Sequence, residues 1–292
     1  MGKLDGRVVI ITGAARGQGE QEARLFAAEG AGVILGDVLD DRGKDLAQEL
    51  GYRARYVHLD VGREDDWSAA VAVARSQFGR LDGLVNNAGI LRFNELVNTP
   101  LEEYEEVVRV NQTGVFLGMK AVIPELEATG GGTIVNTASY TALTGMAFLT
   151  AYAATKAAVL GMTRVAALEL AGKGIRVNAM CPGAVDTPMV NPGKAAAQGY
   201  GPEGGSGTSG EDSGATDDSR ARDDSRARDD SRTTDDSKAM YDYCAKAVPL
   251  GRIGRPEEVA RLALFLSCED SSYVTGQPFV IDGGWLSGVS VL

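Results

Sequence analysis

The sequence predicts an α/β fold in which one parallel β-sheet is covered by helices on both faces. Short β-branched runs alternate with longer stretches of helical periodicity along most of the 292 residues, and parallel strands need such crossover helices. Residues suited to ligand binding directly follow several of these runs, where the carboxyl ends of parallel strands meet. With 44% hydrophobic residues, the chain can bury one large core.

The first βα unit sets the pattern for the rest of the chain. Val8–Thr12 is a compact β-branched run that breaks at a glycine-rich turn, and an amphipathic stretch follows as far as Ala28. Further strands are expected at residues 32–37, 53–59, 81–85, 133–138, 175–180 and 278–281. Further helices are expected at residues 64–78, 101–126, 151–171 and 256–266. This alternation indicates a single domain with a doubly wound parallel sheet of the Rossmann type.

The glycine-rich turn predicts a phosphate-binding site. Gly13, Gly17 and Gly19 let the backbone approach a pyrophosphate, and the helix that begins there offers unpaired N–H groups and the positive end of its dipole. Glu22 stands where the common G-x-G-x-x-G pattern has its third glycine, so the motif here is Thr-Gly-x-x-x-Gly-x-Gly. An ordinary glycine-rich turn is the alternative interpretation.

Asp37 predicts the choice of cofactor. It ends the second strand 18 residues after Gly19, about where a ribose-binding carboxylate is expected. Its carboxylate can accept hydrogen bonds from both adenosine ribose hydroxyls and would repel a 2′-phosphate, which favours NAD over NADP. Arg16 in the turn argues the other way, since a cation there can hold a phosphate, although it can equally contact the pyrophosphate or solvent.

The ends of the later strands carry further polar or glycine residues. They are Asp60, Asn86-Asn87-Ala88-Gly89, Ser139 and Pro182-Gly183. Together with Gly13 and Asp37, they make six strand ends that converge on one edge of the predicted sheet, where α/β proteins bind ligands. Core packing alone does not explain this concentration.

Tyr152 and Lys156 predict the chemistry of the site. They lie four residues apart in an Ala-rich helical stretch, so both project from one face of the helix. A phenol with a pKa of about 10 is a poor base near neutral pH, but an adjacent ammonium lowers that pKa and makes Tyr152 a usable proton acceptor. Ser139 can hydrogen-bond the same substrate oxygen. Because a Tyr-x-x-x-Lys match is common by chance, the surrounding motifs must support this interpretation.

Asn111 falls in the apolar stripe of the helix expected at 101–126, where a buried amide needs hydrogen-bond partners. It either satisfies the helix backbone at a kink or holds a water that passes protons to Lys156. Three other residues are interpreted as packing residues: His58 inside a strand, Trp67 and Trp285.

Charge and cysteine content limit the partners of the chain. Its 29 basic and 40 acidic residues give a net charge of −11, which argues against nucleic acid or an anionic membrane and favours a small-molecule substrate. Three cysteines without paired spacing and one histidine predict reduced thiols and no metal cluster. Charged residues precede the first apolar run, which is too short for a signal peptide or membrane span, so we expect a cytoplasmic protein.

The sequence resembles a classical short-chain dehydrogenase/reductase over nearly the whole chain except residues 193–239. The resemblance rests on Thr12-Gly-x-x-x-Gly-x-Gly19, Asn86-Asn-Ala-Gly89, Asn111, Ser139, Tyr152-x-x-x-Lys156 and Pro182-Gly183 with Thr187. It implies a catalytic tetrad of Asn111, Ser139, Tyr152 and Lys156. In that tetrad Tyr152 takes the alcohol proton while hydride leaves for the nicotinamide, Ser139 positions the oxygen, and Lys156 also holds the nicotinamide ribose.

The resemblance also implies a set of residues that hold NAD. They are Thr12, Gly13, Arg16, Gly17, Gln18, Gly19, Asp37, Asp60, Val61, Asn87, Gly89, Tyr152, Lys156, Pro182, Gly183, Val185 and Thr187. Gln18 and Ala138 depart from the commoner residues of the family, but neither change removes a catalytic atom.

Within the family, the chain is most similar to the bacterial 3α/20β-hydroxysteroid dehydrogenases. This similarity rests on four segments, at 56–61, 82–89, 114–120 and 271–276, which concern fold and cofactor rather than substrate. Three functions stay open: an NAD-linked secondary alcohol dehydrogenase acting on steroids or other alcohols, a 3-oxoacyl-carrier-protein reductase, and a non-catalytic NAD-binding regulator. The family resemblance, with the Ala/Gly/Met-rich outer faces of helices 101–126 and 151–171, also predicts a homotetramer.

Residues 193–239 interrupt the pattern. A Gly-Ser-rich segment leads into an Asp-Asp-Ser-Arg-Ala-Arg repeat with a period of six, between Asp217 and Lys238. Almost nothing in it is apolar, so its burial cannot offset the entropy of ordering it. We expect a low-complexity, disordered insertion in the region of the substrate lid rather than a second domain. An acidic docking site is the alternative.

Overall fold

The computed structural model describes residues 2–191 and 243–288, so the insertion predicted at 193–239 lies outside the described residues. Seven strands form one sheet in the order β3-β2-β1-β4-β5-β6-β7, and all neighbouring strands are parallel. The strands are β1 Val8–Thr12, β2 Gly32–Asp37, β3 Ala54–His58, β4 Gly83–Asn86, β5 Gly132–Thr137, β6 Ile175–Pro182 and β7 Pro278–Ile281. The order reverses between β1 and β4, and this confirms the predicted doubly wound sheet.

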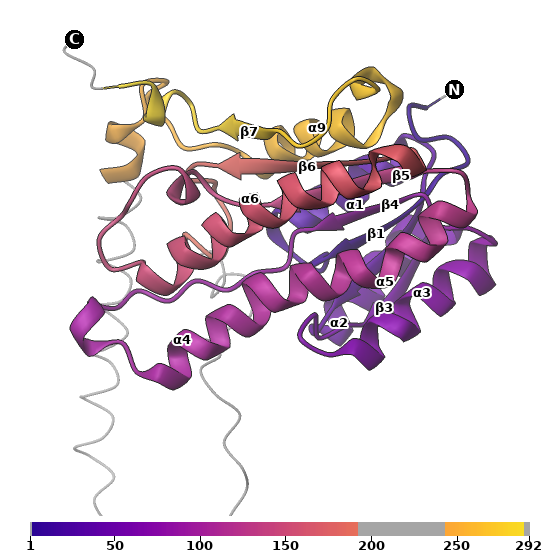
Figure 1. Ribbon diagram of the computed structural model, residues 1–292, viewed down its shortest axis with the longest axis horizontal. Helices are drawn as coiled ribbons and strands as arrows, with labels where there is room; N and C mark the ends of the chain where they lie inside the picture. Colours follow the sequence, from indigo (N-terminus) through magenta and orange to yellow (C-terminus); the bar gives the residue numbers. More distant parts are fainter. Residues whose placement is uncertain (1, 192–242, 289–292) are drawn as a thin grey trace, which may run out of the picture.

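Helices cover both faces of the sheet (Figure 1). On one face lie α3 Glu64–Phe78, α4 Leu101–Val108, α5 Gly114–Ala128 and α6 Thr150–Leu170. On the other lie α1 Gly17–Ala28, α2 Asp40–Leu50 and α9 Pro256–Ser267. Side chains of β1 show how one strand serves both cores, because Val8 and Ile10 pack toward α3 to α6, whereas Val9 and Ile11 pack toward α1 and α9. Strands buried on both faces explain the continuous β-branched runs.

The helical region expected at 101–126 contains a break. α4 and α5 are joined by a π-helical turn, Arg109–Thr113, and the extra residue of such a turn changes which side chains face inward. Asn111 lies in this turn and is fully buried. The expected irregularity of the helix is found, but the side chain of Asn111 bonds the backbone of Ile90 in the loop after β4 and not the backbone of its own helix.

Two sequence interpretations are corrected. The helix α2 was not expected, since it begins with Asp40-Asp41 and buries only Gly43 and Leu46. His58 is not a core histidine: its ring is exposed at the end of β3, and its Nδ1 lies 2.7 Å from a carboxylate oxygen of Asp40.

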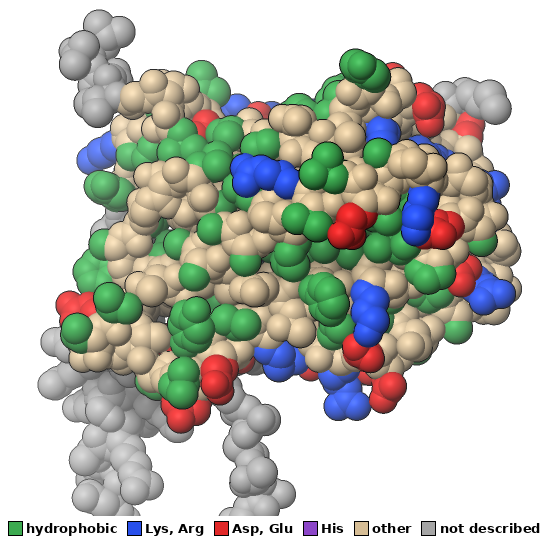
Figure 2. Space-filling view, viewed as in Figure 1, with side chains coloured by type: hydrophobic (Ala, Val, Ile, Leu, Met, Phe, Trp, Pro, Cys, Tyr) green, Lys and Arg blue, Asp and Glu red, His purple; other side chains and the backbone are tan. Residues whose placement is uncertain are grey.

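One face of the molecule exposes apolar side chains over α5 and α6 (Figure 2). Phe116 on α5 is 51% exposed, and Val165 and Leu168 on α6 are 55% and 83% exposed. Within residues 2–191 and 243–288, no helix is long and apolar enough to cross a membrane.

Candidate active site

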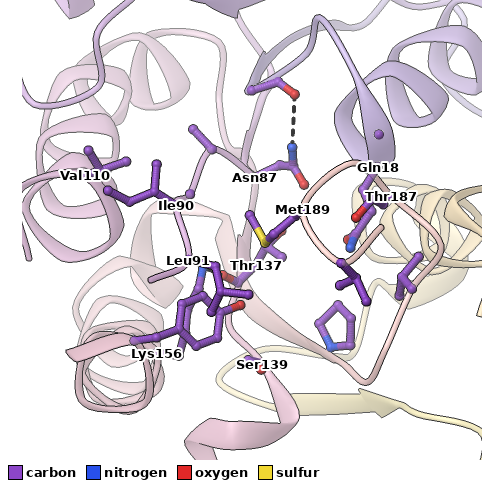
Figure 3. Close-up of a pocket in the computed structure, with 18 of the residues that line it drawn as sticks. Gln18, Asn87, Ile90, Leu91, Val110, Thr137, Ser139, Lys156, Thr187 and Met189 are labelled. Atoms are coloured by element: carbon purple, nitrogen blue, oxygen red, sulfur yellow. Dashed lines mark hydrogen bonds between the residues drawn. The ribbon is translucent and has the colours of Figure 1, made fainter. Parts of the chain in front are cut away.

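A pocket of about 500 Å³ opens at the carboxyl ends of the strands (Figure 3). Most of the residues predicted for the site line it: Gly13, Arg16, Gly17, Gln18, Asp37, Asp60, Val61, Asn87, Gly89, Ser139, Tyr152, Lys156, Pro182, Gly183, Val185 and Thr187. Thr12, Gly19 and Asn111 do not line it and lie behind this wall. The topology therefore brings together residues that are up to 174 positions apart, as the strand ends predicted.

The turn between β1 and α1 has the shape that a dinucleotide requires. Gly13 and Gly17 both have φ of +63°, a conformation that strains other residues. A side chain on Gly13 would place its Cβ 2.9 Å from the Cα of Ala88, so the turn also passes very close to the end of β4. No side chain caps the first turn of α1, which leaves the positive end of this helix directed to the pocket. The residues present thus fit a pyrophosphate.

Thr12 and Asn87 tie the ends of β1 and β4 together. The hydroxyl Oγ1 of Thr12 accepts hydrogen bonds from the backbone N–H groups of Asn87 and Ala88, each at 3.0 Å. In return, the side-chain amide of Asn87 donates to the carbonyls of Thr12 and Gly13 at 3.0 and 3.2 Å. A side chain on Gly19 would come within 2.6 Å of that amide. Thr12 and Gly19 therefore shape the turn from behind the pocket.

Asp37 is held in place at the end of β2 by two backbone groups. Its Oδ2 accepts from the N–H of Ala15 at 2.9 Å, and its Oδ1 accepts from the N–H of Leu39 at 3.0 Å. Each carboxylate oxygen has a second lone pair for a ligand. Arg16 also lines this part of the pocket and is exposed.

Asp60 lies at the end of β3 in an ion pair that the sequence did not predict. Nη1 of Arg109 lies 2.7 and 2.8 Å from its two carboxylate oxygens, and the N–H of Gly62 donates to it at 2.9 Å. Arg109 belongs to the π-helical turn and lines the pocket as well. This pair joins the end of β3 to the helical layer beside Val61.

Asn111 acts on the pocket wall through the backbone. Its Oδ1 accepts from the N–H of Ile90 at 2.8 Å, and its Nδ2 donates to the carbonyl of Ile90 at 2.9 Å, so one amide clamps both backbone groups. A Cβ on Gly89 would lie 3.3 Å from Asn111 Oδ1 and 3.5 Å from Lys156 Nζ. A side chain on Gly89 would therefore press on the Asn111 amide and contact Lys156, so a glycine suits this position.

Ser139, Tyr152 and Lys156 meet in the pocket, as predicted. Lys156 Nζ lies 5.6 Å from the centroid of the Tyr152 ring, above its face. Burial raises the pKa of Tyr152 to about 12, although a hydrogen bond with Ser139 opposes this rise. Burial also lowers the pKa of Lys156 to about 8. Lys156 donates to the carbonyl of Thr137 at 2.7 Å, so the expected net lowering of the Tyr152 pKa by Lys156 is not found in this geometry.

The segment after β6 covers the glycine turn. A Cβ on Gly17 would lie 3.4 Å from Cγ2 of Thr187, which places Thr187 directly against the turn. Thr187 is itself held by its own N–H, which donates to the carbonyl of Val185 at 2.8 Å. Gln18 and Thr187 lie side by side in Figure 3. They form the wall opposite Ile90 and Leu91.

Trp285 lines the pocket, so its interpretation as a packing residue was incomplete. It stacks on Tyr140, which follows Ser139 directly, and these two aromatic residues come from segments 145 positions apart. No sequence pattern links them. In the part of the chain that the structure describes, no group of three or more His, Cys, Asp or Glu residues could hold a metal.

Comparisons with known proteins agree with this geometry. The family model described as short chain dehydrogenase matches residues 7–198, and one described as Enoyl-(Acyl carrier protein) reductase matches residues 227–286. A 3-alpha-(or 20-beta)-hydroxysteroid dehydrogenase of Mycobacterium tuberculosis is 39% identical over 99% of this chain and 93% of its own length. A trans-4-hydroxycyclohexanecarboxylate dehydrogenase of Sinomonas cyclohexanicum is 35% identical over 97% and 93%, respectively.

Among solved structures, a 3-ketoacyl-(acyl-carrier-protein) reductase of Brucella melitensis in complex with NADH is similar to this chain, with a TM-score of 0.78. The two proteins are 31% identical, and the match covers 97% of this chain and 99% of that one. Fold, pocket and relatives lead to one conclusion: the chain belongs to the short-chain dehydrogenase/reductase family and is an oxidoreductase that uses a nicotinamide cofactor.

Proposed function

We propose that this enzyme is an NAD-linked dehydrogenase that interconverts a cyclic secondary alcohol, such as a hydroxysteroid, and its ketone. The observation that carries the proposal is the meeting of the Tyr152 phenol, the Ser139 hydroxyl and the Lys156 ammonium in one pocket with the glycine turn. The first group can exchange a proton, the second can hold an oxygen, and the third supplies positive charge.

In this proposal Tyr152 takes the proton of the substrate hydroxyl. A phenol with a pKa of about 12 is a strong base once it is ionised, but it is rarely ionised at neutral pH. The Ser139 hydroxyl, which opposes the rise of the Tyr152 pKa, favours the phenolate, and Lys156 lies 5.6 Å from the ring with its Nζ directed to the carbonyl of Thr137. When bound, the nicotinamide accepts the hydride from the alcohol carbon. In the reverse direction Tyr152 returns the proton to the ketone oxygen.

Ser139 and Asn111 have supporting roles in the proposed mechanism. The Oγ of Ser139 accepts from the N–H and the hydroxyl of Thr141, at 3.2 and 2.9 Å, so its own proton is directed to the Tyr152 oxygen, beside which the substrate oxygen would bind. Asn111 is a positioning residue, because it holds the backbone of Ile90 rather than the pocket itself. Its clamp fixes the loop after β4, beside Gly89 and Lys156.

Asp37 supports NAD over NADP. Both of its oxygens are oriented by backbone N–H groups, so the carboxylate is set to receive ribose hydroxyls and to repel a 2′-phosphate. Arg16 remains the opposing feature of this region. The NADH in the related Brucella melitensis structure is compatible with this preference.

The related enzymes support a cyclic substrate, since two of them are named for a hydroxysteroid and a hydroxycyclohexane compound. The alternative function is a 3-oxoacyl-carrier-protein reductase, the activity named for the Brucella melitensis relative. Against it stand Asp37, which opposes NADPH, and the net charge of −11, which opposes an acidic carrier protein. A non-catalytic regulator is disfavoured because the chain has all four tetrad residues.

We further propose a homotetramer in the cytoplasm. The exposed apolar side chains Phe116, Val165 and Leu168 on α5 and α6 suit a contact with a second copy of the chain. The three cysteines of the described residues are unpaired and buried, which suits a reducing compartment.

Initial rates with NAD and with NADP, measured on hydroxysteroids, cyclic alcohols and 3-hydroxyacyl thioesters, test the proposed function. We expect the highest kcat/KM with NAD and a cyclic alcohol. A higher value with NADP and a 3-hydroxyacyl thioester would instead establish the carrier-protein reductase.

A further inference from the structure

The pocket extends beyond the reacting groups into an aromatic compartment. Tyr140 and Trp285 line it with ring centroids 4.8 Å apart and planes inclined by 21°, so the two rings are stacked. Tyr140 belongs to the short 3-10 helix Tyr140–Ala142 after Ser139, and Trp285 begins another, Trp285–Ser287, after β7. The mechanism proposed above uses neither ring.

Tyr140 is fixed by contacts at both its ring and its hydroxyl. Its hydroxyl lies 3.0 Å from the sulfur of Met146 and donates to it, while the ring is held against Trp285. Burial raises the pKa of Tyr140 to about 12, with smaller contributions from Cys244 and Tyr152. Tyr140 is therefore neutral at working pH, and the stacked pair lines the same pocket as Tyr152.

The carboxylate of Asp282 holds the backbone of the turn that carries Trp285. Asp282 accepts hydrogen bonds from the N–H groups of Gly284 and Leu286, both at 2.8 Å. Gly284 has φ of +91°, and a Cβ there would lie 3.3 Å from Pro249. The backbone of this turn is thus packed tightly against the segment at 248–250, which fixes the position from which the indole projects, and stacking on Tyr140 sets the plane of the ring.

We propose that Trp285, backed by Tyr140, is the residue that makes the enzyme select ring-shaped secondary alcohols over open-chain ones. This inference rests on the proposed function and names the side chain responsible for its substrate class. The flat aromatic surface is already stacked before substrate binds, and a rigid substrate ring can contact it over its whole face. An open-chain substrate loses rotational freedom when it lies on the same surface. The advantage of the ring depends on the indole plane rather than on the reacting groups.

Cyclohexanol and 2-hexanol are suitable probes because both are six-carbon secondary alcohols and differ in ring closure. Their kcat and KM are measured with NAD for wild type, Trp285→Ala, Trp285→Leu and Trp285→Phe. We expect Trp285→Ala to reduce the cyclohexanol to 2-hexanol ratio of kcat/KM about tenfold, mainly through the KM of cyclohexanol, which corresponds to about 1.4 kcal/mol. Trp285→Phe keeps most of the preference, whereas Trp285→Leu, which is apolar but not planar, loses it.

Binding of NADH, followed by fluorescence titration, separates this role from a general loss of structure. The Kd for NADH is expected to stay within twofold of wild type in the Phe and Leu variants, which test the inference even where Trp285→Ala does not fold. Equal losses for both alcohols, or an unchanged ratio in Trp285→Leu, would overturn the inference while leaving the proposed function intact. Wild-type enzyme that turns over no cyclic alcohol contradicts the proposed function itself.

Discussion

Glu22 makes the stability of the fold depend on pH in an unusual direction. It lies in α1 with 0% of its surface exposed, and neither carboxylate oxygen has a hydrogen-bond partner. Burial alone raises its pKa from 4.5 to about 8. Below pH 4.5 the carboxyl is protonated in both the folded and the unfolded chain. Between pH 4.5 and 8 the unfolded chain releases this proton while the folded chain keeps it, so stability falls as pH rises.

The size of this effect follows from the pKa difference. At about 1.4 kcal/mol per pH unit, the loss is roughly 3 kcal/mol at pH 7 and reaches about 5 kcal/mol above pH 8. Glu22→Gln keeps the shape of the side chain but cannot ionise, so it removes this dependence. We expect the free energy of unfolding of the variant, relative to that of wild type, to increase as pH rises from 5 to 8.

Thermal unfolding of both proteins between pH 5 and 9 measures this gain. A difference of 3 kcal/mol corresponds to roughly 5 to 10 °C in Tm. Glu105→Gln, which changes an exposed glutamate in α4, serves as the control and should show a small, pH-independent difference. A Tm difference for Glu22→Gln that stays constant from pH 5 to 9 would refute the reasoning.

Three further predictions concern cofactor, assembly and proton transfer. Asp37→Ala should narrow the NAD over NADP preference in kcat/KM by about tenfold or more, because repulsion of the 2′-phosphate is lost, whereas exposed Asp41→Ala leaves the ratio unchanged. Leu168→Glu should reduce the mass in light scattering below that of a tetramer. Leu96→Glu, at a leucine that is also exposed (71% against 83%) but lies outside α5 and α6, should leave the mass unchanged, and a monomeric wild type contradicts this prediction. Because the pKa of Tyr152 is raised to about 12, the phenolate fraction rises about tenfold per pH unit between pH 6 and 8, and kcat/KM for alcohol oxidation should rise with it. A kcat/KM that does not change with pH over this range contradicts this prediction.

The sheet and most of the pocket could be predicted from the sequence because their signals are local. A β-branched run followed by a glycine turn specifies β1 and α1, and the four-residue spacing of Tyr152 and Lys156 specifies their shared helix face. The helix α2 was not predicted because its apolar stripe is nearly absent. Gly43 stands in its centre, since it packs against the ring of Tyr56.

Features that depend on three-dimensional packing could not be predicted. The π-helical turn Arg109–Thr113 adds one residue to a continuous apolar stripe, and periodicity does not reveal such an insertion. The direction of the Lys156 ammonium, toward the carbonyl of Thr137, depends on burial and not on helix spacing. The stacking of Tyr140 on Trp285 joins distant segments, neither of which carries a motif for it.

The central claim is that the Tyr152 hydroxyl transfers the proton, and Tyr152→Phe tests it most directly. The substitution removes one oxygen and keeps the ring, so NADH should bind with a Kd within twofold of wild type while kcat for alcohol oxidation falls by at least about 10³-fold, within the range of general acid–base catalysis. Tyr273→Phe, which removes a hydroxyl from a fully exposed tyrosine, should keep wild-type turnover. A Tyr152→Phe enzyme that binds NADH and retains turnover within tenfold of wild type would contradict the proposed mechanism.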